Sequence, residues 1–265
     1  MVMSSNLPTT RKSQFKHIIK YRWKYLFLMG GILILFAIPL LVSLFIKDLK
    51  AISIVSVSEG NETSALFIND LFYAVFIIPS SVIFFVGLSG IYRIMRNYIW
   101  AEGVIFKSDF IIGIKRNWLH FAITGFLFSL LFYGLYLATV YISTPFVRYL
   151  PLAICFIVIY PVFLVHMNLT VIYKNNYFIQ FKNGFVLYVK RFYIYLPFFL
   201  LVVAVPLVFM IFSIPLIIKY VVLFAFIYLF IPFYVLVISE YSMHVFDENI
   251  NKTRHPDLYK KGLFD

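Results

Sequence analysis

The chain has 265 residues, of which 63% are hydrophobic and 13% are charged, and its formal net charge is +12. Soluble domains usually carry about a quarter charged residues, so this composition excludes an ordinary soluble domain. It predicts an integral membrane protein whose surface is covered mainly by lipid.

Several apolar stretches are long enough to cross a bilayer as helices, which takes about 20 residues each. Uninterrupted runs of this length predict helices, because in lipid only helices and closed barrels satisfy the backbone. Prolines inside most of them predict kinks whose freed carbonyls are satisfied by neighbouring helices, in preference to a gating hinge. The prediction is therefore an all-α integral membrane protein with one domain over residues 1–265, a leader at 1–24, a solvated tail at 240–265, and six spans at about 25–46, 71–92, 118–142, 149–173, 192–213 and 219–239.

The basic residues predict how the chain is oriented. Of the 23 Lys and Arg residues, nineteen lie in the leader, in the loops at 93–116 and 174–191, and in the tail. The other four are Lys47, Lys50, Arg148 and Lys219. Because cytoplasmic loops are enriched in Lys and Arg, both termini are predicted to be cytoplasmic. The first span is too long for a cleavable signal peptide and is predicted to remain as an anchor.

Three similar basic segments precede the first, third and fifth spans: RKSQFKHIIKYRW (11–23), FKSDFIIGIKRNW (106–118) and FKNGFVLYVKRFY (181–193). Each predicts a short amphipathic helix in the membrane interface, with Ser13, Ser108 and Asn183 as N-caps. The chain is thus predicted to form three hairpins, each preceded by such a helix. The residues predicted to meet lipid and its headgroups are Lys12, Phe15, Lys20, Trp23, Lys107, Phe110, Lys115, Arg116, Trp118, Lys182, Phe185, Lys190 and Arg191.

Interfacial anchoring is favoured for these segments over the alternative, docking of a cytoplasmic partner. Anionic lipid of the inner leaflet is the predicted partner of the positive charge, which is spread along the ends of the spans. Nucleic acid is disfavoured for the same reason, since its partners gather basic residues on one face.

Few residues suggest chemistry. The sequence contains neither a phosphate-binding G-x-x-x-x-G-K-[ST] loop nor an H-E-x-x-H zinc motif, and no catalytic, cofactor or metal residue is predicted. Gly87 and Gly90 are interpreted as small residues that let helices approach closely. His166, Asn168 and Thr170 form a candidate polar site in the fourth span. A hydrogen bond between helices is favoured for His166 over a proton or substrate role.

Three segments carry a family resemblance: GLSGIYRIMRNYIWAEGVIFKSDFIIGIKRNW (87–118), HMNLTVIYKNNYFIQFKNGFVLYVKRF (166–192) and FDENINKTRHPDLYKKGLFD (246–265). Together with the six-span layout, they resemble the YesL family of bacterial multi-pass membrane proteins, which has no established molecular activity. The resemblance implies a bacterial plasma membrane and association with carbohydrate uptake systems of the ABC type. It carries over no functional residues.

The predicted function is that of a non-enzymatic accessory or scaffolding membrane protein, with membrane transport subunits as candidate partners. The residues predicted to dock a partner are Arg93, Arg96, Glu102 and Asp109, together with the tail. The alternative is a stand-alone transporter or channel for a neutral small solute, which predicts a water-lined cavity reaching His166 and Asn168. An intramembrane enzyme is the least favoured reading, since these polar residues are too few to build its site.

Overall fold

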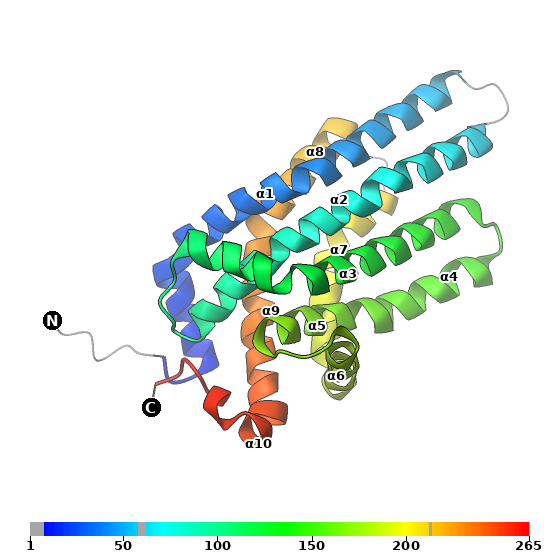
Figure 1. Ribbon diagram of the computed structural model, residues 1–265. Helices are drawn as coiled ribbons and strands as arrows, with labels where there is room; N and C mark the ends of the chain where they lie inside the picture. The colour runs from blue at the N-terminus through cyan, green and yellow to red at the C-terminus, as the bar shows by residue number, and fades with distance from the viewer. Residues whose placement is uncertain (1–7, 58–61, 212–213, 265) are drawn as a thin grey trace.

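The computed structural model describes residues 8–57, 62–211 and 214–264, and the regular structure of these residues is entirely helical (Figure 1). Three long helices come first, and each packs against the next: α1 (Arg11–Val57), α2 (Glu62–Ile99) and α3 (Phe106–Tyr141). Their ranges cover the first three predicted spans apart from residue 142, whereas residues 1–7 of the predicted leader lie outside the described residues. Apolar runs of this length satisfy their own backbone only as helices.

The second half of the chain is more broken. Two pairs of helices are joined end to end by π-helical turns: α4 (Pro145–Ile154), η1 (Cys155–Ile159) and α5 (Tyr160–Ile172), then α8 (Leu216–Ala225), η2 (Phe226–Phe230) and α9 (Ile231–Phe246). Between these pairs lie α6 (Tyr177–Lys190) and α7 (Phe192–Ile211), which meet at 105°. The chain closes with η3 (Asp247–Asn251), α10 (Lys252–Arg254) and η4 (Pro256–Leu258).

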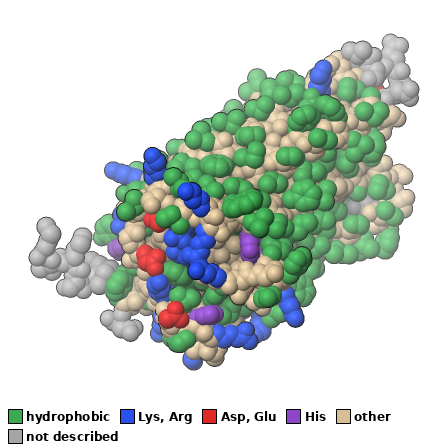
Figure 2. Space-filling view, viewed as in Figure 1, with side chains coloured by type: hydrophobic (Ala, Val, Ile, Leu, Met, Phe, Trp, Pro, Cys, Tyr) green, Lys and Arg blue, Asp and Glu red, His purple; other side chains and the backbone are tan. Residues whose placement is uncertain are grey.

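The surface of the helices is that of a multi-pass membrane protein. Within the described residues, five helical segments are long and apolar enough to cross a membrane, and six if α6 and α7 together form one bent span. Large apolar side chains stand outside the bundle, such as Val75, which is 69% exposed, and Ile217, which is 76% exposed. Soluble proteins rarely expose apolar surface so widely. Figure 2 shows this apolar cover, with charged side chains gathered at the end that holds the chain termini.

The centre of the bundle is α5. Every side chain from Tyr160 to Val171 is buried, and the helix contacts α2, α3, α6, α7 and α9. A helix with apolar side chains on every face suits a position in the centre of a bundle. The polar side chains on this helix are therefore buried as well, and any hydrogen-bond partner they have lies within the protein.

Prolines shape both broken helices. Pro161 and Pro232 are each the second residue after a π-helical turn. A proline has no N–H to offer the carbonyl four residues earlier, and its ring pushes that carbonyl away. For Pro161 this carbonyl belongs to Ile157, and it accepts a hydrogen bond from the Tyr188 hydroxyl of α6. The prediction that neighbouring helices satisfy freed carbonyls is confirmed at this position.

Glycines allow the closest helix contacts, as predicted for Gly87 and Gly90. A Cβ atom on Gly90 would lie 2.4 Å from the Phe110 ring, and one on Gly113 would lie 2.9 Å from the Gly90 Cα atom. A Cβ atom on Gly30 of α1 would lie 1.9 Å from the backbone oxygen of Tyr228. Any larger residue at Gly30 or Gly113 would force the helix backbones apart.

The three predicted interfacial helices have different outcomes. Only the third, α6, is a separate helix, and it carries an exposed apolar face (Phe178, Ile179, Phe185, Val186 and Val189). Residues 11–24 and 106–117 are instead the first turns of α1 and α3, so the prediction of separate short helices is wrong there. In both helices the backbone hydrogen bonding continues without a break from the predicted interfacial segment into the predicted span. Figure 1 nevertheless shows α1 changing direction near its start.

The predicted N-caps are also wrong. Thr10 caps α1, and Thr10 and Ser13 each donate a backbone N–H to the other's hydroxyl, at 3.0 and 3.2 Å. At α6 the side chain of Asn176 accepts from the Phe178 N–H. The helix start of α3 is stabilised by Asp109, whose carboxylate accepts from the Ile105 N–H at 2.9 Å. Each helix begins two to six residues before the predicted cap. An upstream side chain caps α1 and α6, whereas the N-cap residue of α3, Ile105, makes no side-chain cap.

Replacing Tyr188 with Phe should destabilise the folded protein by about 1–3 kcal/mol, because the Ile157 carbonyl loses its donor in a buried site. The matched control is Tyr234→Phe. Both tyrosines are 4% exposed, but the Tyr234 hydroxyl has no hydrogen-bond partner among the described residues. The thermal unfolding midpoint of each purified variant in mild detergent measures its stability. Equal midpoints for the two variants would contradict this account of the kink.

Candidate functional site: a polar network at the basic end

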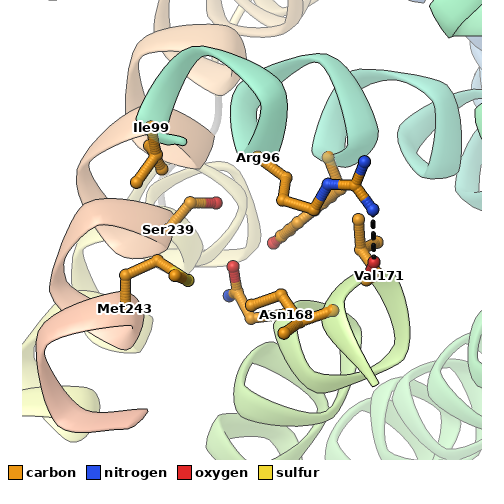
Figure 3. A pocket seen from close by; sticks show the side chains of 8 residues that line it. Arg96, Ile99, Asn168, Val171, Ser239 and Met243 are labelled. Carbon is orange, nitrogen blue, oxygen red and sulfur yellow. Dashed lines mark hydrogen bonds between the residues drawn. The ribbon is translucent and has the colours of Figure 1, made fainter. Parts of the chain in front are cut away.

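The polar network begins at the C-terminal end of α2, where a small cavity lies between α2, α5 and α9 (Figure 3). Arg96, Asn168 and Ser239 line it, and NH1 of Arg96 donates to the Val171 carbonyl at 3.2 Å. Its volume of about 10 Å³ is close to the least space that holds one water molecule. The cavity therefore fits a single buried water rather than a solute.

Arg96 is the most connected charged side chain at this end of the bundle. Its NH2 group lies 2.6 Å from the Asn97 side-chain oxygen and 3.7 Å from the Glu102 carboxylate. Its guanidinium stacks on the Trp100 ring at 4.5 Å, and the ammonium of Lys261 lies 4.2 Å from the same ring. An arginine that is only 8% exposed holds its charge in such a site because every side of it is paired.

These contacts change the role of the four residues predicted to dock a partner. Arg96 is buried, Glu102 bonds to Lys261 at 2.8 Å, and Asp109 serves the start of α3. Arg93 is half-buried and packs its Cβ against Gly113. The four residues are close in sequence, but in the structure at least three of them have partners within the chain.

The C-terminal segment folds onto the bundle, so the predicted solvated tail is wrong for most of its length. Helix α9 continues through Phe246, and Asp247 follows it into a buried position. Arg11 of α1 binds the Asp247 carboxylate at 2.7 Å, and the Asn251 side chain donates to it at 2.8 Å. Asn251 in turn accepts from the Tyr173 hydroxyl at 2.5 Å. These residues join α1, the end of α5 and the C-terminal segment.

A second contact between the two ends of the chain requires a glycine. The Gln14 side chain donates to the carbonyl of Ile99 and, at 2.9 Å, to that of Gly262. Gly262 has a φ of +85°, and a Cβ atom there would lie 2.1 Å from the Ile99 oxygen. Only glycine fits both this backbone conformation and this close approach.

Gln180 of α6 extends the network to α3 and α5. Its side-chain oxygen lies 3.0 Å from His120 Nδ1 and accepts from the Thr170 hydroxyl at 2.7 Å. Its amide nitrogen donates to the Tyr173 carbonyl at 2.7 Å. Gln180 is 2% exposed, and it fixes α6 across the end of α5. In the sequence, the signal for this contact is a single glutamine in an aromatic segment, and the sequence analysis did not single it out.

The candidate polar site in α5 does not form one cluster. Thr170 bonds to Gln180, whereas Asn168 donates to the Leu164 carbonyl and lines the small cavity. His166 lies among rings, 6.2 Å from His120 and 4.5 Å from Tyr177 between centroids. Its ring nitrogens have no hydrogen-bond partner in the described part of the chain, so the interhelical hydrogen bond predicted for His166 is not found.

The predicted lipid-facing residues lie largely at the surface, at one end of the molecule. The exposed ones are Lys12, Lys20, Trp23, Lys107, Lys115, Arg116, Trp118, Lys182, Phe185 and Lys190. Arg191 is half-exposed and binds Glu248 at 2.5 Å. The aligned positions Phe15, Phe110 and Phe185 are half-buried, buried and exposed, so similar sequence has not produced three equivalent surfaces.

A second polar cluster, at the opposite end of the helices, was not predicted. Asp70 of α2 is 3% exposed, lies 3.3 Å from the Lys47 ammonium and accepts from the Tyr141 hydroxyl at 2.8 Å. Asp48 binds Lys219 at 2.5 Å. Sequence reasoning counted Lys47 and Lys219 only as markers of orientation. The cluster joins α1, α2, α3 and α8, which are brought together by the fold rather than by spacing in the sequence.

Glu240 of α9 is a buried acid outside both clusters. It is 5% exposed, and neither carboxylate oxygen has a hydrogen-bond partner among the residues described. The predicted tail begins at this residue, but α9 carries it into the bundle. A group of three or more metal-binding side chains does not occur in residues 8–57, 62–211 and 214–264.

Comparison of the chain with protein-family models, curated proteins and solved structures found no match. The resemblance to the YesL family therefore stays a prediction.

Asp247→Ala should release the C-terminal segment, because Arg11 and Asn251 lose their shared partner and Arg11 stays as an uncompensated, largely buried charge. Limited trypsin digestion of the purified protein measures this release as faster cleavage after Lys252 and Arg254. Asp257→Ala is the control, since Asp257 is exposed and has no ion pair among the described residues. Cleavage at the same rate in both variants would show that Asp247 does not hold the segment.

Proposed function

We propose that this multi-pass membrane protein is a non-enzymatic accessory or scaffolding component of a membrane assembly, acting through its basic end. The observation that carries the proposal is the network from Arg11 through Asp247 and Asn251 to Tyr173, with Gln180 beyond it. It joins the first helix, the central helix and the last residues into one folded face. The network fixes the positions of the side chains on this face, and such a fixed surface suits the binding of a partner.

The competing role, a transporter or channel for a neutral solute, needs a water-lined path at His166 and Asn168. The cavity at Asn168 has room for about one water molecule, and aromatic rings pack around His166. Ion-coupled transport would require a charged site near the membrane centre. The charged clusters of the described residues lie instead towards the two ends of the helices. These features favour the accessory role.

The resemblance to the YesL family supplies the proposed setting. On this basis we propose that the protein lies in a bacterial plasma membrane, as a companion of transport subunits that take up carbohydrate by an ABC-type mechanism. The proposed orientation has both termini in the cytoplasm. The distribution of charge supports it, because nineteen of the 23 basic residues lie in the segments at this end.

Thiol labelling in cells tests the orientation. Cys155→Ala provides a cysteine-free background, and Lys252→Cys and Glu62→Cys then place single thiols at exposed positions near opposite ends of the bundle. We expect a membrane-impermeant maleimide to label Glu62→Cys in intact cells and Lys252→Cys only after the membrane is opened. The reverse pattern would contradict the proposed orientation.

Affinity purification from mild detergent tests the accessory role. We expect ABC-type transporter subunits to be recovered with the tagged protein, and carbohydrate uptake to fall when the protein is deleted. The double variant Lys115→Glu/Arg116→Glu, at exposed positions of α3, should recover several-fold less of these subunits. Lys50→Glu, an exposed lysine at the opposite end of α1, is the control and should recover the normal amount. Recovery of the protein alone, with uptake unchanged by its deletion, would contradict the proposed function.

A further inference from the structure

A polar groove lies between α6 and the C-terminal segment, next to the network described above, whose members Tyr173 and Gln180 line its inner side. Its volume is about 210 Å³, far larger than that of the cavity at Arg96. One wall is α6 with the loop before it, and the other is the segment from η3 to His255. The polar side chains that line it and stay free of side-chain hydrogen bonds among the described residues are Asn175, Asn183, Lys190, Arg254 and His255, of which His255 packs its ring against Tyr173.

The groove has a positive charge that the rest of the described chain does not neutralise. Lys190 and Arg254 are exposed, and neither forms an ion pair with a described carboxylate. The acidic residues next to the groove are engaged elsewhere: Asp247 binds Arg11, and Glu248 binds Arg191 and lies 3.3 Å from His244. An anion in the groove would meet two cations and two amide side chains without a competing carboxylate.

The position of the groove indicates the kind of anion. Helix α6 meets α7 at 105°, and it exposes Phe178 (78%) and Val189 (55%) beside the groove wall. An amphipathic helix with an exposed apolar face lies in the membrane interface, with its apolar side chains among acyl chains. The groove is then at the level of the headgroups. Arginine and lysine with amide donors form the usual site for a phosphate group.

We propose that this groove binds the phosphate group of an anionic phospholipid of the inner leaflet. Lys190 and Arg254 pair with the phosphate oxygens, and the side-chain amides of Asn175 and Asn183 donate to the remaining oxygens or to the headgroup. The acyl chains lie along the exposed apolar face of α6. The lipid thereby joins α6 to the C-terminal segment, two elements that the described residues also connect through Tyr173 and Gln180 and through the ion pair of Arg191 with Glu248.

The test uses the full chain in nanodiscs of phosphatidylcholine with and without phosphatidylglycerol, transferred to detergent for native mass spectrometry. We expect the wild-type protein to retain one phosphatidylglycerol molecule. Lys190→Ala/Arg254→Ala should weaken this retention by about tenfold or more, since two charge-assisted contacts are lost. Asn183→Asp, which places a negative charge in the groove, should weaken it as well.

The matched control is Lys174→Ala/Lys252→Ala. It removes the same charge from the loop before α6 and from α10, at exposed positions that do not line the groove, and should retain the lipid as the wild type does. Equal loss in the two double variants would overturn the proposal, because retention would then depend on overall charge. Unchanged retention in Lys190→Ala/Arg254→Ala would overturn it too.

Addition of soluble phosphate distinguishes a lipid headgroup from a soluble phosphate ester as the anion that the groove binds. Inorganic phosphate and glycerol 3-phosphate are added to the wild-type protein in phosphatidylcholine nanodiscs and to the protein loaded with phosphatidylglycerol. A lipid site predicts that neither displaces the lipid. Displacement by either soluble anion would assign the groove to a soluble phosphate ester and overturn the lipid proposal. The thermal midpoint of each variant in phosphatidylcholine alone verifies that it folds.

Discussion

One constraint shapes most of the structure: a polar group buried among apolar helices costs free energy unless it has a partner within the protein. In lipid, no water replaces a missing donor, and each unpaired group costs several kcal/mol. The Ile157 carbonyl freed by Pro161 shows the consequence, since a hydroxyl from another helix reaches across to it. The same requirement explains why Gln180 is bonded to three neighbours and why Asp247 is held by an arginine from the start of the chain.

This constraint divides the molecule into three levels along the helices. Charged and amide side chains hold the helices together at the two ends, around Arg96 and Asp247 at one and around Asp70 at the other. Between them the contacts are aromatic, as where Tyr160 lies against Phe128 and Phe199. A polar end can exchange partners with a ligand or another protein at modest cost, whereas an aromatic middle holds the helices at fixed distances. The basic end, with its groove, is therefore the part of the molecule suited to recognition.

The sequence predicted what depends on composition and local pattern. Long apolar runs predicted the helices, and Gly87 and Gly90 predicted a close helix approach. The helix boundaries were missed because Thr10 and Asn176 cap their helices before the predicted positions, and nothing interrupts α1 or α3 where interfacial helices were expected to end. The site was missed for another reason. Its pairs, such as Arg11 with Asp247, are 236 residues apart, and no local pattern marks such a contact.

The basic end also explains why the termini matter more than their sequences suggest. Residues near both ends of the chain meet there, through Gln14 with Gly262 and through Arg11 with Asp247. These contacts hold the start of α1 against the segment that follows α9, and so couple the two helices. The groove next to these contacts contains two cations, Lys190 and Arg254, that no carboxylate of the described residues neutralises. An anion bound there strengthens this coupling by joining α6 to the same C-terminal segment. Membrane composition would thus act on the face that the proposed partner meets.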